Sequence, residues 1–157
     1  MIFFTGGEII EVAIQIEKNG LYFYRSLAGI LDQDDIIELF LHLAGEEEKH
    51  IKSFKSLYES LKDYKPEIAD EEEYYSYIKM FAEMNVFTKK AGLENMIGKI
   101  HKKEDALNMA ISFEKDSILF FAEIKDMVKT SQKEAVDHLI NQEKEHLKKL
   151  MTMKLKK

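Results

Sequence analysis

Six side chains in this 157-residue sequence have the type and spacing of metal ligands. Each one interrupts the apolar face of a stretch whose other apolar residues recur at helical spacing. Four are carboxylates, which are costly to bury unless they are protonated, paired or bound to metal, and which repel each other when they converge. Divalent cations would remove that conflict. The six candidates are Glu17, Glu47, His50, Glu114, Glu143 and His146.

The pairs Glu47-x-x-His50 and Glu143-x-x-His146 each place a carboxylate and an imidazole on one side of a helix, because residues i and i+3 are neighbours there. Two helices with a lone Glu and two with Glu-x-x-His are the ligand set of a carboxylate-bridged di-iron or di-manganese centre. Oxygen and imidazole ligands without thiolate favour iron or manganese, although zinc could bind the same set. We therefore expect two iron ions, with manganese or zinc as alternatives. The competing interpretation is a set of buried salt bridges in a charge-rich bundle.

The two halves of the sequence resemble each other, which the salt-bridge interpretation does not explain. The segment 13–18 (AIQIEK) matches 110–115 (AISFEK) at an offset of 97 residues, and 43–51 matches 139–147 at an offset of 96. A duplicated helical hairpin with pseudo-twofold symmetry would give each metal ion one histidine and a share of the carboxylates.

Helical periodicity and the scarcity of breakers (one Pro and seven Gly) predict an all-α protein. Four long helices are expected at about 6–30, 34–62, 102–128 and 131–154. Ser131 and Glu134 have the spacing of a capping box at the start of the last helix. Short first and third connections and a long second one predict a single domain over 1–157, a ferritin-like four-helix bundle of two hairpins.

The long connection, about 63–101, carries Pro66 and an aromatic cluster from Tyr74 to Phe81. A structureless loop of this length inside a compact domain would be unusual, so we expect a crossover with one or two short helices. The aromatic cluster is expected to pack these helices on the bundle, with a dimer contact or a docking site as the alternative.

Composition limits the class of protein. The 23 basic and 29 acidic residues give a net charge of −6, which argues against a nucleic-acid partner. The absence of cysteine excludes disulfides and thiolate metal sites. There is no apolar run long enough to span a membrane and no signal-peptide pattern, so we expect a cytoplasmic protein without a membrane partner.

Four stretches of the sequence resemble the rubrerythrin and erythrin branch of the ferritin-like di-iron carboxylate superfamily: 13–24 (AIQIEKNGLYFY), 43–54 (LAGEEEKHIKSF), 110–121 (AISFEKDSILFF) and 140–150 (INQEKEHLKKL). The resemblance implies that the six candidates are metal ligands and that Glu47 and Glu143 bridge the two ions. Rubrerythrins usually also carry a rubredoxin domain with a four-cysteine iron site, which a chain without cysteine cannot form. Electrons would therefore come from another protein. Rubrerythrins place a further Glu where this chain has Ser117, whose counterpart in the first half is Gly20.

The resemblance implies an oxidoreductase that reduces hydrogen peroxide, or dioxygen, at a di-iron centre with electrons from an external donor protein. Two alternatives remain open at this point. One is a ferroxidase or iron-handling protein, and the other is a non-catalytic bundle that keeps the metals as a structural clip. We also expect a homodimer, in which the long crossover would allow helices to be exchanged between chains.

Tyr24 lies two turns after Glu17 on the same face and could donate a hydrogen bond near the metals; the alternative is a packed core tyrosine. His42 and the two remaining histidines, His101 and His138, have no Glu three residues before them and are expected at the surface. Glu46 and Glu48 flank Glu47 and are expected in solvent, with Glu46 also a candidate to support a ligand from behind.

Overall fold

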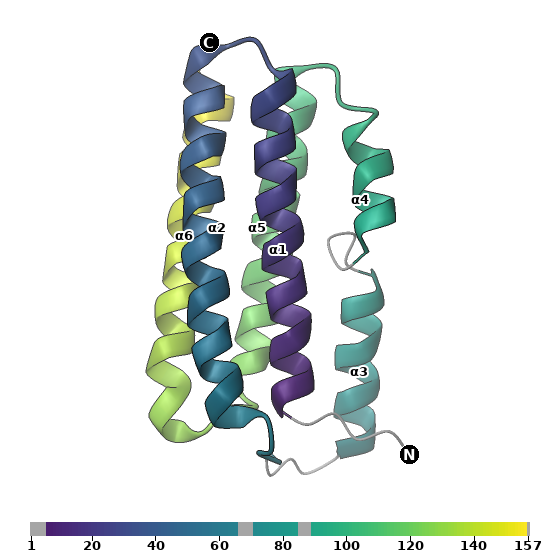
Figure 1. The fold of residues 1–157 in the computed structure, drawn as a ribbon, viewed down its shortest axis with the longest axis vertical. Helices are drawn as coiled ribbons and strands as arrows, with labels where there is room; N and C mark the ends of the chain where they lie inside the picture. Colours follow the sequence, from purple (N-terminus) through teal and green to yellow (C-terminus); the bar gives the residue numbers. More distant parts are fainter. Residues whose placement is uncertain (1–5, 66–70, 85–88, 157) are drawn as a thin grey trace.

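The computed structural model describes residues 6–65, 71–84 and 89–156, and its regular structure over those ranges is entirely helical (Figure 1). Four long helices form the bundle: α1 (Gly6–Ile30), α2 (Asp34–Leu61), α5 (Lys103–Lys125) and α6 (Lys133–Leu155). The predicted all-α four-helix bundle is therefore confirmed. Within the described ranges, no helix combines the length and the apolar character needed to cross a membrane.

The α5–α6 connection differs from the prediction. Helix α5 ends at Lys125 rather than near 128, because the N–H groups of Asp126 and Met127 bond to carbonyls only three residues back. A 3₁₀ turn, η2 (Thr130–Gln132), then precedes α6. The predicted capping box is wrong: Ser131 lies inside this turn, Gln132 takes the N-cap position, and no side chain caps the helix.

The crossover contains two short helices, α3 (Glu71–Met84) and α4 (Lys90–Ile97), which lie one after the other along the side of the bundle (Figure 1). Helix α4 contacts α1, and α3 contacts α5. The Tyr74 hydroxyl donates to the carbonyl of Glu123 at 2.9 Å, while Ile78 and Leu93 are buried. The described part of the crossover therefore packs on the bundle. Pro66 and the side chains of Tyr75 and Phe81 lie outside the described residues.

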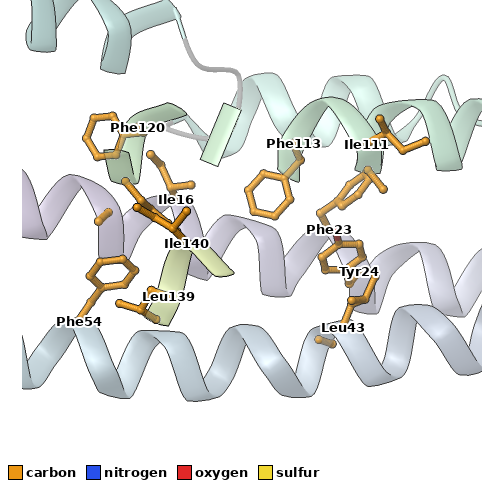
Figure 2. Close-up of a cluster of buried hydrophobic side chains, with 14 of the residues drawn as sticks. Ile16, Phe23, Tyr24, Leu43, Phe54, Ile111, Phe113, Phe120, Leu139 and Ile140 are labelled. Carbon is orange, nitrogen blue, oxygen red and sulfur yellow. The ribbon is translucent and has the colours of Figure 1, made fainter. Parts of the chain in front are cut away.

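Apolar side chains fill the interior of the bundle in two groups along its length (Figure 2). One group includes Phe23, Tyr24, Leu43, Ile111 and Phe113, and the other includes Ile16, Phe54, Phe120, Leu139 and Ile140. Along α1, α2 and α5, the candidate ligands lie between residues of these two groups, and on α6 they lie between Ile140 and the buried Leu150. Polar side chains at mid-length are therefore enclosed by hydrocarbon on both sides, which lowers the local dielectric constant.

Gly20 allows the Phe113 ring to pack directly on the backbone of α1. A Cβ at this position would lie 2.5 Å from Cζ of Phe113, a distance at which the ring must move. We predict that Gly20→Ala destabilises the protein by about 1–3 kcal/mol through overpacking. The matched control is Gly45→Ala, where a Cβ meets nothing within 4 Å, and it should stabilise by about 0.5–1 kcal/mol because alanine favours helices. Urea unfolding compares the two, and equal stability of both variants would contradict the prediction.

Candidate metal centre

All six candidate ligands lie in the interior of the bundle and are essentially inaccessible to solvent. Each long helix contributes at least one of them: Glu17 from α1, Glu47 and His50 from α2, Glu114 from α5, and Glu143 and His146 from α6. All six belong to a single chain in this structure. A complete cluster therefore does not require helices to be exchanged between two chains.

The six side chains form two overlapping groups of four, and in each group the possible ligand atoms lie within 4.8 Å of one another. We call the first group (Glu17, Glu47, His50 and Glu143) the His50 position, and the second (Glu47, Glu114, Glu143 and His146) the His146 position. Each position contains one histidine and one carboxylate of its own. Glu47 and Glu143 belong to both, which is the arrangement that two bridging carboxylates require.

Both histidines present Nδ1 to the carboxylates. Nδ1 of His50 lies 2.8 Å from Glu143 Oε1 and 3.1 Å from Glu17 Oε2. Nδ1 of His146 lies 3.2 Å from Glu143 Oε2 and 3.6 Å from Glu114 Oε1. The two rings stack nearly parallel, with centroids 5.3 Å apart. The imidazoles thus flank Glu143 from two sides.

Burial strongly affects how these groups ionise. Burial raises the pKa of Glu17, Glu47 and Glu114 above the usual range, and repulsion from neighbouring carboxylates of the cluster raises it further. Burial also acts to raise the pKa of Glu143, but the polar groups of Glu114, His146 and His50 beside it hold the pKa below the usual range. Burial would lower the pKa of His50, yet the neighbouring carboxylates of Glu143, Glu17 and Glu47 raise it well above 6.5. Without metal, the cluster therefore keeps several of its protons.

The donor set fits two divalent cations. Five buried carboxylate oxygens (Glu17 Oε1, Glu47 Oε1, Glu47 Oε2, Glu114 Oε2 and Glu143 Oε1) have no partner with hydrogen-bond geometry in the described part of the chain. Such orphaned acceptors are rare in proteins and call for an explanation, of which a bound ion is one. Four ionised carboxylates with two neutral imidazoles carry the charge that two divalent ions would balance. Oxygen and imidazole donors are the ligands that iron and manganese prefer.

Comparison with known proteins agrees with this geometry. A family model for rubrerythrin matches residues 8–154. The chain belongs to the rubrerythrin family. It is also similar to a solved structure of a candidate ferritin-like di-iron carboxylate protein from Thermotoga maritima, with a TM-score of 0.66, 29% sequence identity, and coverage of 98% of this chain and 97% of that one. No curated protein matches this chain. Together with the buried Glu and His cluster, these likenesses identify a ferritin-like di-metal carboxylate centre.

This member of the rubrerythrin family has Ser117 at the position where the resemblance implies a further Glu. Ser117 is buried, and its hydroxyl has no hydrogen-bond partner among the described residues. Its counterpart in the first half, Gly20, is covered by the Phe113 ring. Neither position offers a fifth carboxylate to the candidate donor set of four Glu and two His.

Tyr24 contacts the cluster directly. Its hydroxyl donates to Glu114 Oε1 at 2.6 Å, and burial followed by the nearby Glu114 charge raises the pKa of the phenol well above 10, which keeps the proton in place. Phe121 holds the equivalent place in the second half and packs on Phe54, with ring centroids 4.8 Å apart. The cluster therefore has a phenol donor on the side of Glu114 and none at the equivalent residue.

The three remaining histidines lie in solvent, whereas Glu46 lies close to the cluster. His42, His101 and His138 are exposed, as the sequence predicts. Glu46 is more deeply placed than a solvated flank: its side chain is 18% exposed, and its Oε2 lies 4.0 Å from Nε2 of His146. The sequence signal for this contact is weak, because it depends on how α2 and α6 pack across the bundle.

Proposed function

We propose that this protein is a di-iron oxidoreductase that reduces hydrogen peroxide, or dioxygen, with electrons from an external donor protein. The observation that supports the proposal most is the pair of overlapping four-residue groups that share Glu47 and Glu143. When bound, two ferrous ions supply the two electrons that convert peroxide, with two protons, into two molecules of water. The chain contains no cysteine and so has no thiolate iron site of its own, which is why we assign the donor role to another protein.

In this proposal, each side chain of the cluster has a separate role. Glu47 and Glu143 would be shared between the two ions, and Glu17 and Glu114 would be the carboxylates particular to the His50 and His146 positions. His50 and His146 would hold one ion each, because each turns Nδ1 toward the carboxylates. The apolar groups on either side of the cluster exclude water, which strengthens the electrostatic interactions inside it. Tyr24 holds one oxygen of Glu114 and thereby its orientation.

The test is a rapid-mixing reaction of anaerobically loaded Fe(II) protein with hydrogen peroxide or with dioxygen. We expect one peroxide to be consumed per pair of ferrous ions, with the oxidised iron still bound and reducible for a second turnover. If the oxidised iron instead leaves the site while particle size grows with added Fe(II), the protein is a ferroxidase or iron-handling protein. If bound iron raises the melting temperature but peroxide does not oxidise the iron, the metal only stabilises the bundle and the protein is not a catalyst. Either of the last two results contradicts the proposal.

Tyr24→Phe is the informative variant in the same experiment. Loss of the hydrogen bond to Glu114 should slow the peroxide reaction by about 10- to 100-fold, the usual effect of removing a partner of a metal ligand. Tyr22→Phe is the matched control, because it makes the same change on the exposed face of the same helix. Equal rates for both variants would show that Tyr24 only fills space in the core.

A further inference from the structure

The two nitrogens of each candidate histidine have different surroundings. Nδ1 of His50 forms a hydrogen bond with Glu17 Oε2 at 3.1 Å, and Nδ1 of His146 forms one with Glu143 Oε2 at 3.2 Å. The second nitrogen, Nε2, therefore lies on the far side of each ring from these oxygens. Nε2 of His50 is buried and has no hydrogen-bond partner in the described part of the chain. A buried nitrogen without a partner calls for an explanation, of which a bound ion is one.

Glu46 lies beside the two rings and outside the two four-residue groups. One oxygen of Glu46, one ring nitrogen of His50 and one ring nitrogen of His146 lie within 4.8 Å of one another. The distance from Glu46 Oε2 to His146 Nε2 is 4.0 Å, which is too long for a hydrogen bond. Two ligands of one ion can have this separation, because metal–ligand distances of about 2.1 Å place two ligand atoms up to about 4.2 Å apart. The three residues are thus a candidate cation site of two imidazoles and one carboxylate.

Of these three residues, Glu46 is the one that reaches solvent. Its side chain is 18% exposed, whereas the side chains of His50 and His146 are 1% and 3% exposed. Its Oε1 accepts a hydrogen bond from Lys49 at 2.9 Å, which leaves Oε2 for a cation. A cation that arrives from this side therefore meets Glu46 before it meets the buried histidines.

A metal ion needs an intermediate site of this kind because the centre is closed. All six candidate ligands are essentially inaccessible to solvent. A cation without ligands is costly to move through apolar surroundings. The imidazoles can hold it on the way, since each ring has one nitrogen toward the carboxylates and a second one on its far side. A neutral imidazole binds a cation through one nitrogen and keeps its proton on the other, so each ring serves one position at a time.

We propose that Glu46, His50 and His146 form an outer cation site through which divalent metal ions enter the two-metal centre. The inference rests on the proposed two-metal centre. An entering ion binds first between Glu46 and the two rings, and then passes the rings to reach the carboxylates. The ligand atoms of the outer site are up to 4.8 Å apart, which is wider than one ion spans unless the side chains move. The outer site is therefore weak and passes its ion inward.

The test is stopped-flow mixing of the metal-free protein with Co(II), followed by the visible absorption of the bound ion, and then release of the ion to excess EDTA. In the wild type, the rate of uptake should saturate as the Co(II) concentration rises, because binding at the outer site precedes entry. Glu46→Gln should slow uptake by at least about tenfold, within the range over which local charge raises association rates. Release should slow by the same factor, so that the Kd and the number of bound ions stay unchanged. A ligand of the final centre would change the Kd instead.

Glu48→Gln is the matched control, because it removes the same charge from the exposed flank of Glu47 and should leave both rates unchanged. Two results would overturn the inference while the two-metal centre stands. One is equally fast uptake by Glu46→Gln and Glu48→Gln. The other is a weaker Kd in Glu46→Gln, since Glu46 would then hold the bound ions rather than admit them. Failure of the folded wild type to bind any Co(II) would overturn the two-metal centre, and the inference with it.

Discussion

Protein purified without oxygen and supplied with Fe(II) should bind about two ions per chain, and Glu47→Ala/Glu143→Ala should bind none. The reason is that these two carboxylates belong to both four-residue groups, so their loss leaves each position with one Glu and one His. Binding to the folded state stabilises it by about 2.7 kcal/mol per site at a hundredfold excess of free ion over the dissociation constant. Two sites in a chain of this size should raise the melting temperature by roughly 10–20 °C in the wild type, and by nothing in the variant.

The matched control for this variant is Glu48→Ala/Glu145→Ala, which removes two exposed carboxylates from the same two helices. It should bind as much iron as the wild type. Metal content by elemental analysis and melting by circular dichroism give the two readouts. A folded wild type that binds no metal would contradict the prediction, and the four buried carboxylates would then have to be stabilised by shared protons. Binding of zinc or of a single ion would support the ligand set but weaken the redox proposal.

The metal-free protein should become less stable as the pH rises from about 5 toward 8, the reverse of the usual behaviour of a carboxylate held by a salt bridge. Glu17, Glu47 and Glu114 have raised pKa values, so the folded state keeps protons that the unfolded state releases near 4.5. Stability from these groups is complete below the unfolded pKa and is lost as the pH rises through the folded one. His50, with its pKa raised above 6.5, acts in the same direction at higher pH.

Glu143 acts in the opposite direction, because its lowered pKa gives stability that is lost only as the pH falls below about 4.5. Metal-free stability should therefore be greatest near pH 5. Metal binding requires the deprotonated carboxylates, so stabilisation by Mn(II), which avoids oxidation during the experiment, should increase with pH. Melting temperatures from pH 4.5 to 8.5, with and without Mn(II), test both slopes.

Glu47→Gln/Glu114→Gln supplies the control for the pH experiment. An amide resembles the protonated carboxyl and does not titrate, so the metal-free stability of this variant should depend much less on pH. If the metal-free wild type instead gains stability between pH 5 and 8, the carboxyl groups must ionise freely inside the bundle, and the assigned protonation would be wrong.

The cluster could be located from the sequence because its carboxylates occupy positions at which the helical periodicity predicts apolar residues. Glu17 and Glu114 follow apolar residues at core spacing, and the structure places both inside the bundle. Helix ends were harder to locate, since the tight turn after Lys125 and the position of Ser131 depend on local backbone bonds. A capping box and these backbone hydrogen bonds are alternatives at the start of a helix, and the sequence motif alone does not show which of them forms.

Contacts between helices from different halves were not accessible from periodicity. The pattern places His50 on the inner face of α2, but it does not predict which ring nitrogen of His50 contacts Glu143 on α6. The approach of Glu46 to His146 depends in the same way on the offset between α2 and α6. Spacing along one helix defines a face, whereas the partner of that face depends on packing between helices.

The path from α2 to α5 determines which way up the second hairpin stands. In Figure 1, α2 ends at one end of the bundle and α5 begins at the other, so the connecting chain travels the whole length of a helix. For the 28 residues of α2, that length is about 42 Å. A short loop at this point would orient the second hairpin the same way as the first, and the two hairpins could not then be related by a twofold axis perpendicular to the bundle. The length of the crossover therefore decides whether the two hairpins of one chain can form the centre together. A chain whose connection is shorter than this span could complete the same centre only with the hairpin of a neighbouring chain.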